Sequence, residues 1–233
     1  MSSQPNQSLI DGIRCLQYLV SCDQAVGCRE LARKMAMNST RVNRLLMSMA
    51  SIGLTVQDEQ RRYLPGPGIH ALAAQAIRGS SLFAQALPEL ELHAPRDIVV
   101  ALGVLWEDQV IYVWHSEPGE RSRTSRALAG FHMLPAWQSV IGVALLAAEE
   151  DTVLQPRFSA EVWRQIAPLL ARKRETQVLI WPREEEGTSM AQPINHNRAA
   201  LAFARIRETE KADLQRRLEQ LQALAQRLTT SCV

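Results

Sequence analysis

Apolar residues recur with helical spacing at the start of the chain. From Leu9 to Val20 they form a continuous stripe at intervals of three and four residues, which predicts a helix over 8–20. Ser8 followed by Asp11 resembles a capping box at its start. After a polar loop, a second and shorter helix is predicted over 28–35.

A third helix follows a tight turn and is predicted over 39–52. Ser39 or Thr40 can cap it through a side-chain oxygen, and Gly53 is typical of a helix C-terminus. Apolar and polar residues then alternate over 54–64 on either side of a polar turn, which predicts a two-stranded hairpin. Three helices and a hairpin in some sixty residues predict a winged helix-turn-helix. The inward residues expected on the third helix are Val42, Leu45, Leu46, Met49 and Ile52.

Strand and helix patterns are mixed in the remainder of the chain. Helices are predicted over 69–77, 82–93, 139–148, 158–172 and 207–229. Strands are predicted over 98–106, 110–115, 124–128, 190–194 and 199–204. This mixture lacks regular βαβ alternation, so the expected fold class is α+β. The expected domains are a winged helix-turn-helix over 1–68, a linker helix over 69–84 and an α+β domain over 85–233.

Charge is distributed unevenly, although the chain as a whole carries only +2. Residues 1–80 hold nine Lys or Arg against five Asp or Glu, a net charge of +4, while residues 81–233 carry −2. A small, basic, helical region suits contact with nucleic-acid phosphates. A chance imbalance of four charges is the alternative.

Sequence signatures of catalysis and of metal binding are missing. There is no P-loop, no G-x-G-x-x-G and no G-x-S-x-G, and the five histidines form no H-x-x-x-H pair. We therefore expect no enzyme activity, no cofactor and no metal. The four cysteines are expected to be small buried residues, with a redox switch as the alternative. No signal-peptide pattern or long apolar run occurs, which predicts a cytoplasmic protein.

The outward face of the third helix carries residue types that read DNA bases. If the aliphatic stripe faces inward, Thr40, Arg44 and Met47 face outward, and Ser48 flanks them. Arginine pairs with guanine, asparagine with adenine, and methionine can contact a thymine methyl group. A small helical bundle with a solvated polar face is the alternative. The expected DNA contacts are Ser39, Thr40, Arg41, Asn43, Arg44 and Met47, with Arg29, Arg33, Lys34, Arg61 and Arg62 on phosphates or a neighbouring groove.

Three blocks of sequence resemble the IclR family of bacterial transcriptional regulators. They are LARKMAMNSTRVNRLL (31–46), GFHMLPAWQSVIGVALLA (130–147) and GTSMAQPI (187–194) followed by AALAFA (199–204). The resemblance spans almost the whole chain in the family's order. It implies a GAF-like C-terminal domain that binds a small effector such as an organic acid, a sugar acid or an aromatic catabolite. It also implies operator binding as a homodimer or homotetramer.

The chain departs from the family's pattern at several positions. Arg41 replaces the usual threonine, Trp137 stands where histidine is common, and Val143 where lysine is common. Ala202 and Ala204 replace hydroxyl residues that frequently help to hold the ligand. We therefore expect a less polar pocket, a different ligand or no ligand, since a buried carboxylate needs donors.

The expected effector-binding residues come mostly from the second block, and plain core packing is the alternative for each. They are Leu134, Trp137, Gln138, Ser139, Val140, Ile141 and Met190. A rival function also stays open, in which the chain is an enzyme or small-molecule-binding protein and its N-terminal helices mediate protein contacts.

Overall fold

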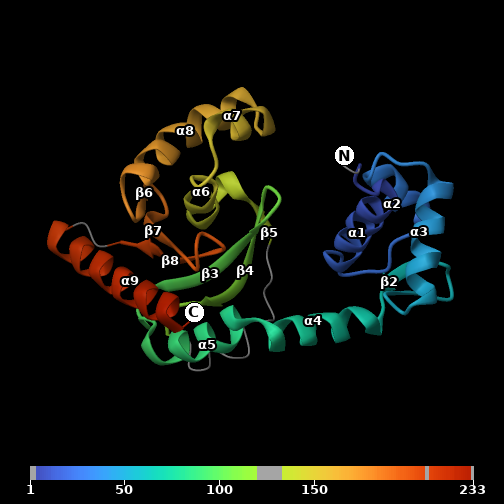
Figure 1. Ribbon diagram of the computed structural model, residues 1–233, viewed down its shortest axis with the longest axis horizontal. Helices are drawn as coiled ribbons and strands as arrows, with labels where there is room; N and C mark the ends of the chain where they lie inside the picture. The colour runs from blue at the N-terminus through green and yellow to red at the C-terminus, as the bar shows by residue number, and fades with distance from the viewer. Residues whose placement is uncertain (1–3, 120–132, 208–209, 232–233) are drawn as a thin grey trace. The chain divides into compact units, whose positions relative to one another are not determined.

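The chain folds into two compact units, Met1–Ser80 and Ser81–Val233, in the computed structural model shown in Figure 1. The structure describes residues 4–119, 133–207 and 210–231. The strand predicted over 124–128 lies outside these residues. Within the described chain, no helix is long and apolar enough to cross a membrane.

The N-terminal unit contains the predicted helices and hairpin. Its elements are α1 (Gln7–Val20), α2 (Cys28–Lys34), α3 (Ser39–Ser51), β1 (Thr55–Gln57), β2 (Tyr63–Pro65) and α4 (Pro67–Gly79). β1 and β2 pair in antiparallel fashion, with Val56 opposite Leu64. One core holds the unit together, formed by buried residues of α1, α2, α3 and β2 that include Cys15, Leu31, Leu46 and Tyr63.

Two helix starts differ from the prediction by one or two residues. Asn6, not Ser8, caps α1, because its side chain accepts hydrogen bonds from the backbone N–H groups of Ser8 and Leu9. Asn38 caps α3 in place of Ser39 or Thr40. Asparagine is an equally good cap, so the sequence offered competing acceptors at each site.

The C-terminal unit is built on one antiparallel sheet of six strands in the order β5-β4-β3-β8-β7-β6. The strands are β3 (Val99–Trp106), β4 (Gln109–Ser116), β5 (Met133–Pro135), β6 (Leu179–Arg183), β7 (Gly187–Ile194) and β8 (Ala199–Ile206). β5 and β6 were not predicted. Both are short edge strands that contain proline, which edge strands tolerate and which weakens a strand signal.

Helices cover both faces of this sheet (Figure 1). One face packs α6 (Val140–Leu146) and α8 (Ala160–Glu175), and the other packs α5 (Ser81–His93) and α9 (Lys211–Ser231). Three shorter elements complete the unit: the 3-10 helices η1 (Ala136–Gln138) and η2 (Gln155–Arg157), and α7 (Asp151–Leu154). The expected α+β class is confirmed, with a core on each side of the sheet.

Candidate functional site

The third helix presents the face that its sequence pattern predicted. Val42 and Leu46 are fully buried and Met49 nearly so, which anchors one side of α3 in the core. Thr40, Arg44 and Met47 are exposed on the opposite side. One inward residue was predicted wrongly: Ile52 is 70% exposed, because α3 ends at Ser51 and Ile52 lies at its C-cap. The orientation of α3 is thus confirmed, and its role in DNA binding stays a prediction.

Arg41 and Asn43 flank this face and are held by neighbouring elements. Arg41 forms an ion pair with Asp11 of α1. Asp11 also accepts a hydrogen bond of 2.8 Å from Gln7. Asn43 accepts a hydrogen bond of 3.3 Å from the Tyr63 hydroxyl of β2. Both side chains therefore have defined positions beside the exposed residues.

Basic residues border α3 on two sides. Arg29, Arg33 and Lys34 are all exposed on α2, and the first two lie one helical turn apart. Ser39 is exposed at the start of α3, and its carbonyl oxygen accepts a bond of 3.4 Å from the Cys28 thiol. These placements leave the predicted phosphate contacts accessible to solvent.

The two arginines of the hairpin differ in their surroundings. Arg62 donates through its backbone N–H (2.7 Å) and its Nε (2.8 Å) to Asp58. Desolvation acts to raise the pKa of Asp58, but the hydrogen bonds from Arg62 outweigh it and the pKa is lowered. Arg61 sits at the turn with a positive φ of 59°, and its side chain is exposed. Arg62 therefore shapes the hairpin tip, and Arg61 is the residue free to extend from it.

The predicted effector residues do not all meet in one place. Val140 and Ile141 are buried in the core between α6 and the sheet, whereas Met190 is buried in the core on the α5 and α9 side. Neighbouring residues of a strand face opposite sides, and on β7 it is Ala191 that faces α6. Met190 therefore lies on the opposite side of the sheet from Val140 and Ile141, and its role in effector binding stays a prediction.

The other predicted lining residues have mixed positions. Leu134 lies exposed on the edge strand β5, and Gln138 is exposed on η1. Ser139 is buried as the N-cap of α6, and its hydroxyl lies 2.9 Å from that of Tyr112. Trp137 is half-buried and packs against the α6 core.

Small and aromatic side chains meet in the core between the sheet and the helices α6 and α8. Ala191, Ala200 and Ala202 point to this side, and Trp163 and Trp181 pack against the same core. Two hollows of about 420 and 530 Å³ lie elsewhere, and both are lined by Asp97 and Arg217. None of the seven predicted effector residues lines either hollow.

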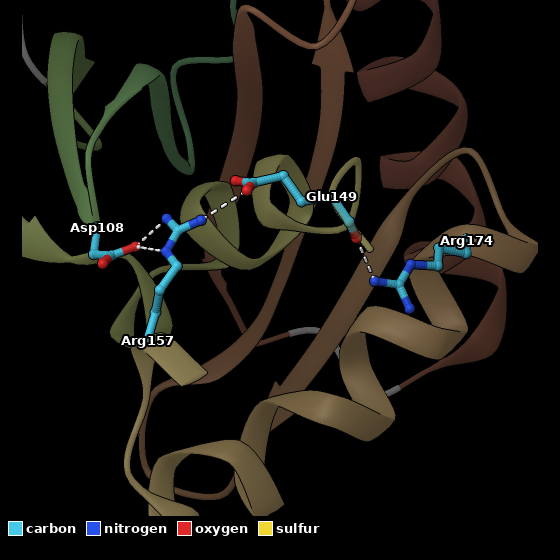
Figure 2. A network of polar contacts seen from close by, with 4 residues as sticks. All are labelled: Asp108, Glu149, Arg157 and Arg174. Carbon is cyan, nitrogen blue, oxygen red and sulfur yellow. Dashed lines mark hydrogen bonds and ion pairs between the residues drawn. The ribbon is translucent and has the colours of Figure 1, made fainter. Parts of the chain in front are cut away.

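Two arginines that the sequence reasoning missed hold the end of α6 (Figure 2). Arg157 binds Asp108 of the β3–β4 turn, and its Nη1 donates to Glu149 at 2.7 Å. Its hydrogen bonding to Asp108 raises the pKa of Arg157. Arg174 of α8 donates to the carbonyl oxygens of Ala147 (3.1 Å) and Glu149 (2.6 Å). Asp108 is 49 residues from Arg157, and the two carbonyl partners of Arg174 are 27 and 25 residues away, so no local pattern indicates these contacts.

Ligand sets for a metal ion do not occur among the described residues: no three His, Cys, Asp or Glu side chains lie together in a suitable group. Cys15 is buried, and Cys22 and Cys28 are half-buried and free. Burial raises the pKa of Cys15 and of Cys28, which keeps both thiols protonated.

Solved structures share this fold over nearly the whole chain. An IclR transcriptional regulator from Alicyclobacillus acidocaldarius has a TM-score of 0.72 and 22% identity, covering 99% of this chain and 100% of its own. A putative IclR regulator from Silicibacter sp. TM1040 has a TM-score of 0.77 and 23% identity, covering 97% and 96%. An IclR homologue from Microbacterium hydrocarbonoxydans, complexed with 4-hydroxybenzoate, has a TM-score of 0.67 and 22% identity, covering 97% and 99%.

No family model and no curated protein matches the chain in sequence. The chain therefore has the fold of IclR transcriptional regulators, as its three blocks of sequence predicted.

Proposed function

We propose that this chain is an IclR-family transcriptional regulator that binds operator DNA through α3 and responds to a small metabolite. The observation that carries the proposal is the exposed face of α3, where Thr40, Arg44 and Met47 stand clear of the core. Exposed basic residues on α2 and at the hairpin flank this face, where the DNA backbone would pass. We propose no enzyme activity for the protein, and we propose that it acts in the cytoplasm.

The protein acts as a homodimer or homotetramer in this proposal. Leu9, Ile13 and Val20 are exposed although apolar, and their spacing places them on one face of α1. Leu72 of α4 is likewise exposed. Exposed apolar stripes favour association, so Ile13→Glu should lower the molar mass measured by light scattering. An unchanged mass would remove α1 from the interface.

The effector is a small organic molecule bound by the C-terminal unit, such as an organic acid, a sugar acid or an aromatic catabolite. The alanine and tryptophan side chains of the core between the sheet and the helices α6 and α8 favour an aromatic group over a strongly polar one. The first compound to test is 4-hydroxybenzoate, which the Microbacterium homologue binds. Binding should change the tryptophan fluorescence and the affinity for the operator together, because a ligand acts only by preferring one state.

The test of DNA binding uses the full-length protein and a selection from random duplexes. The selected site should be pseudo-palindromic, and affinity should fall steeply with salt. Arg44→Ala should lose the preference for that site. Arg61→Ala should weaken binding to all sequences alike, and it should lower the slope of log affinity against log salt concentration by about one. Arg164→Ala is the matched control, because it removes one positive charge from α8 in the other unit.

Each outcome separates the proposal from its rival. If Arg44→Ala keeps the sequence preference, α3 does not read the bases in this orientation. If the wild-type protein selects no site and loses no affinity with salt, the N-terminal unit mediates protein contacts. The chain would then be a small-molecule-binding protein or an enzyme.

A further inference from the structure

Three hydrogen bonds hold Tyr63 of the hairpin in place, two with the backbone of Val26 and one with the third helix. Its backbone N–H donates to Val26 at 2.8 Å and its carbonyl oxygen accepts from Val26 at 2.9 Å. Its ring is 2% exposed, and its hydroxyl donates to Oδ1 of Asn43 at 3.3 Å. Burial raises the pKa of Tyr63, so the hydroxyl keeps the proton that it donates. The position of this hydroxyl is therefore set by the core of the unit.

This bond orients the amide group of Asn43. Its oxygen is turned toward Tyr63, while its Nδ2 donates to the sulfur of Met47 at 3.5 Å. Met47 is exposed on the outward face of α3. Because the oxygen and nitrogen lie on opposite branches of one planar group, an inward oxygen presents the nitrogen outward. Thioether sulfur is a weak acceptor, so a better acceptor can replace it.

The orientation decides which base edges Asn43 can recognise. The bidentate pairing of asparagine with adenine needs both the oxygen and the nitrogen to face the base. An outward nitrogen alone pairs with acceptors, which in the major groove are purine N7, guanine O6 and thymine O4. Cytosine presents an amino donor there and is excluded.

We infer that Tyr63 is a positioning residue that makes Asn43 a hydrogen-bond donor in base recognition, so that Asn43 accepts a base with a major-groove acceptor, either purine or thymine, and rejects cytosine. This inference rests on the proposed function. It replaces the adenine pairing that the sequence alone predicted for Asn43.

The experiment is site selection from random duplexes with the full-length wild-type protein and three variants. Asn43→Ala identifies the base pair that Asn43 contacts, because preference is lost there and kept elsewhere. At that position the wild-type protein should accept adenine and guanine alike. Tyr63→Phe frees the amide to present both of its groups, and should raise the ratio of adenine to guanine by about fivefold or more. Asn43→Asp offers only acceptors and should turn the preference toward cytosine.

Controls keep the inference separate from folding and from the proposed function. Tyr18→Phe removes another tyrosine hydroxyl of the same unit, on α1, and should select the wild-type site. The ratio of bases at one position of the selected DNA does not depend on the fraction of protein that is active. If Tyr63→Phe does not fold, the selection with Asn43→Asp tests the inference instead.

Three results would overturn the inference while DNA binding stands. They are an adenine preference in the wild-type protein, unchanged ratios in Tyr63→Phe, and an Asn43→Ala variant with the wild-type site. If the wild-type protein selects no site at all, the proposed function itself fails.

Discussion

Gly142→Ala should destabilise the C-terminal unit, although alanine is the better helix former. Gly142 lies in α6, where it packs against the 3-10 helix η1. An added Cβ would lie 2.6 Å from the Cα of Ala136 and 2.7 Å from its carbonyl carbon, and closer still to its carbonyl oxygen. These are backbone atoms, so no side-chain rotation can relieve the overlap.

Two opposing effects set the magnitude. Replacing glycine inside a helix gains up to about 1 kcal/mol from helix propensity. Overpacking a well-packed core costs about 1–3 kcal/mol, and contact with backbone places this site at the upper end. The net loss should be about 2 kcal/mol, which lowers the urea midpoint by about 1 M for an ordinary m-value.

Tryptophan fluorescence is the assay, because all five tryptophans lie in residues 81–233 and the signal reports this unit alone. Gly79→Ala, at the end of α4, is the control, since an added Cβ there meets nothing within 4 Å. Its fluorescence midpoint should equal that of the wild type. A midpoint for Gly142→Ala at or above the wild-type value would refute the close approach of η1 to α6.

Three further results follow from particular contacts. Asn38→Ala removes the acceptor for the Thr40 N–H and should cost about 1 kcal/mol, seen by far-UV circular dichroism without a change in fluorescence midpoint. The hydrogen bond from Arg217 lowers the pKa of Asp97 in the folded protein. This contact therefore stabilises the fold fully at a pH above the pKa of the unfolded chain, which is about 3.9. The stabilisation is lost as the pH falls through the lower pKa of the folded state. Asp97→Asn should therefore lower the fluorescence midpoint at pH 7 and flatten its decline below about pH 4; an unchanged acid dependence would contradict this. The buried Cys15 thiol, whose pKa is raised by burial, should react with iodoacetamide only after unfolding, as mass mapping would record.

The sequence predicted α3 well because the information is local. Val42, Leu46 and Met49 repeat at helical spacing, so their burial alone determines which residues point outward. The cap of the same helix was missed by one residue, since Asn38 and Ser39 are both good acceptors and only the backbone geometry distinguishes them.

The residues that face the predicted effector site were harder to predict from the sequence. β7 is buried on both faces, so its side chains show no polar alternation that would separate Met190 from Ala191. A register shift between Thr188 and Met190 adds to the ambiguity. The contact of Arg157 with Asp108 spans 49 residues, and only the folded sheet brings the two together.

The strand order of the C-terminal unit has a consequence for its synthesis. β3 pairs along its length with β8, so that Val100 lies opposite Phe203 at the centre of the sheet. The ribosome must therefore release about one hundred residues after β3 before that pair can form. Until then the edge of β3 that pairs with β8 has no partner strand. The apolar strands β3 and β4 can therefore aggregate or bind chaperones during this time. The N-terminal unit, complete by Ser80, can fold long before.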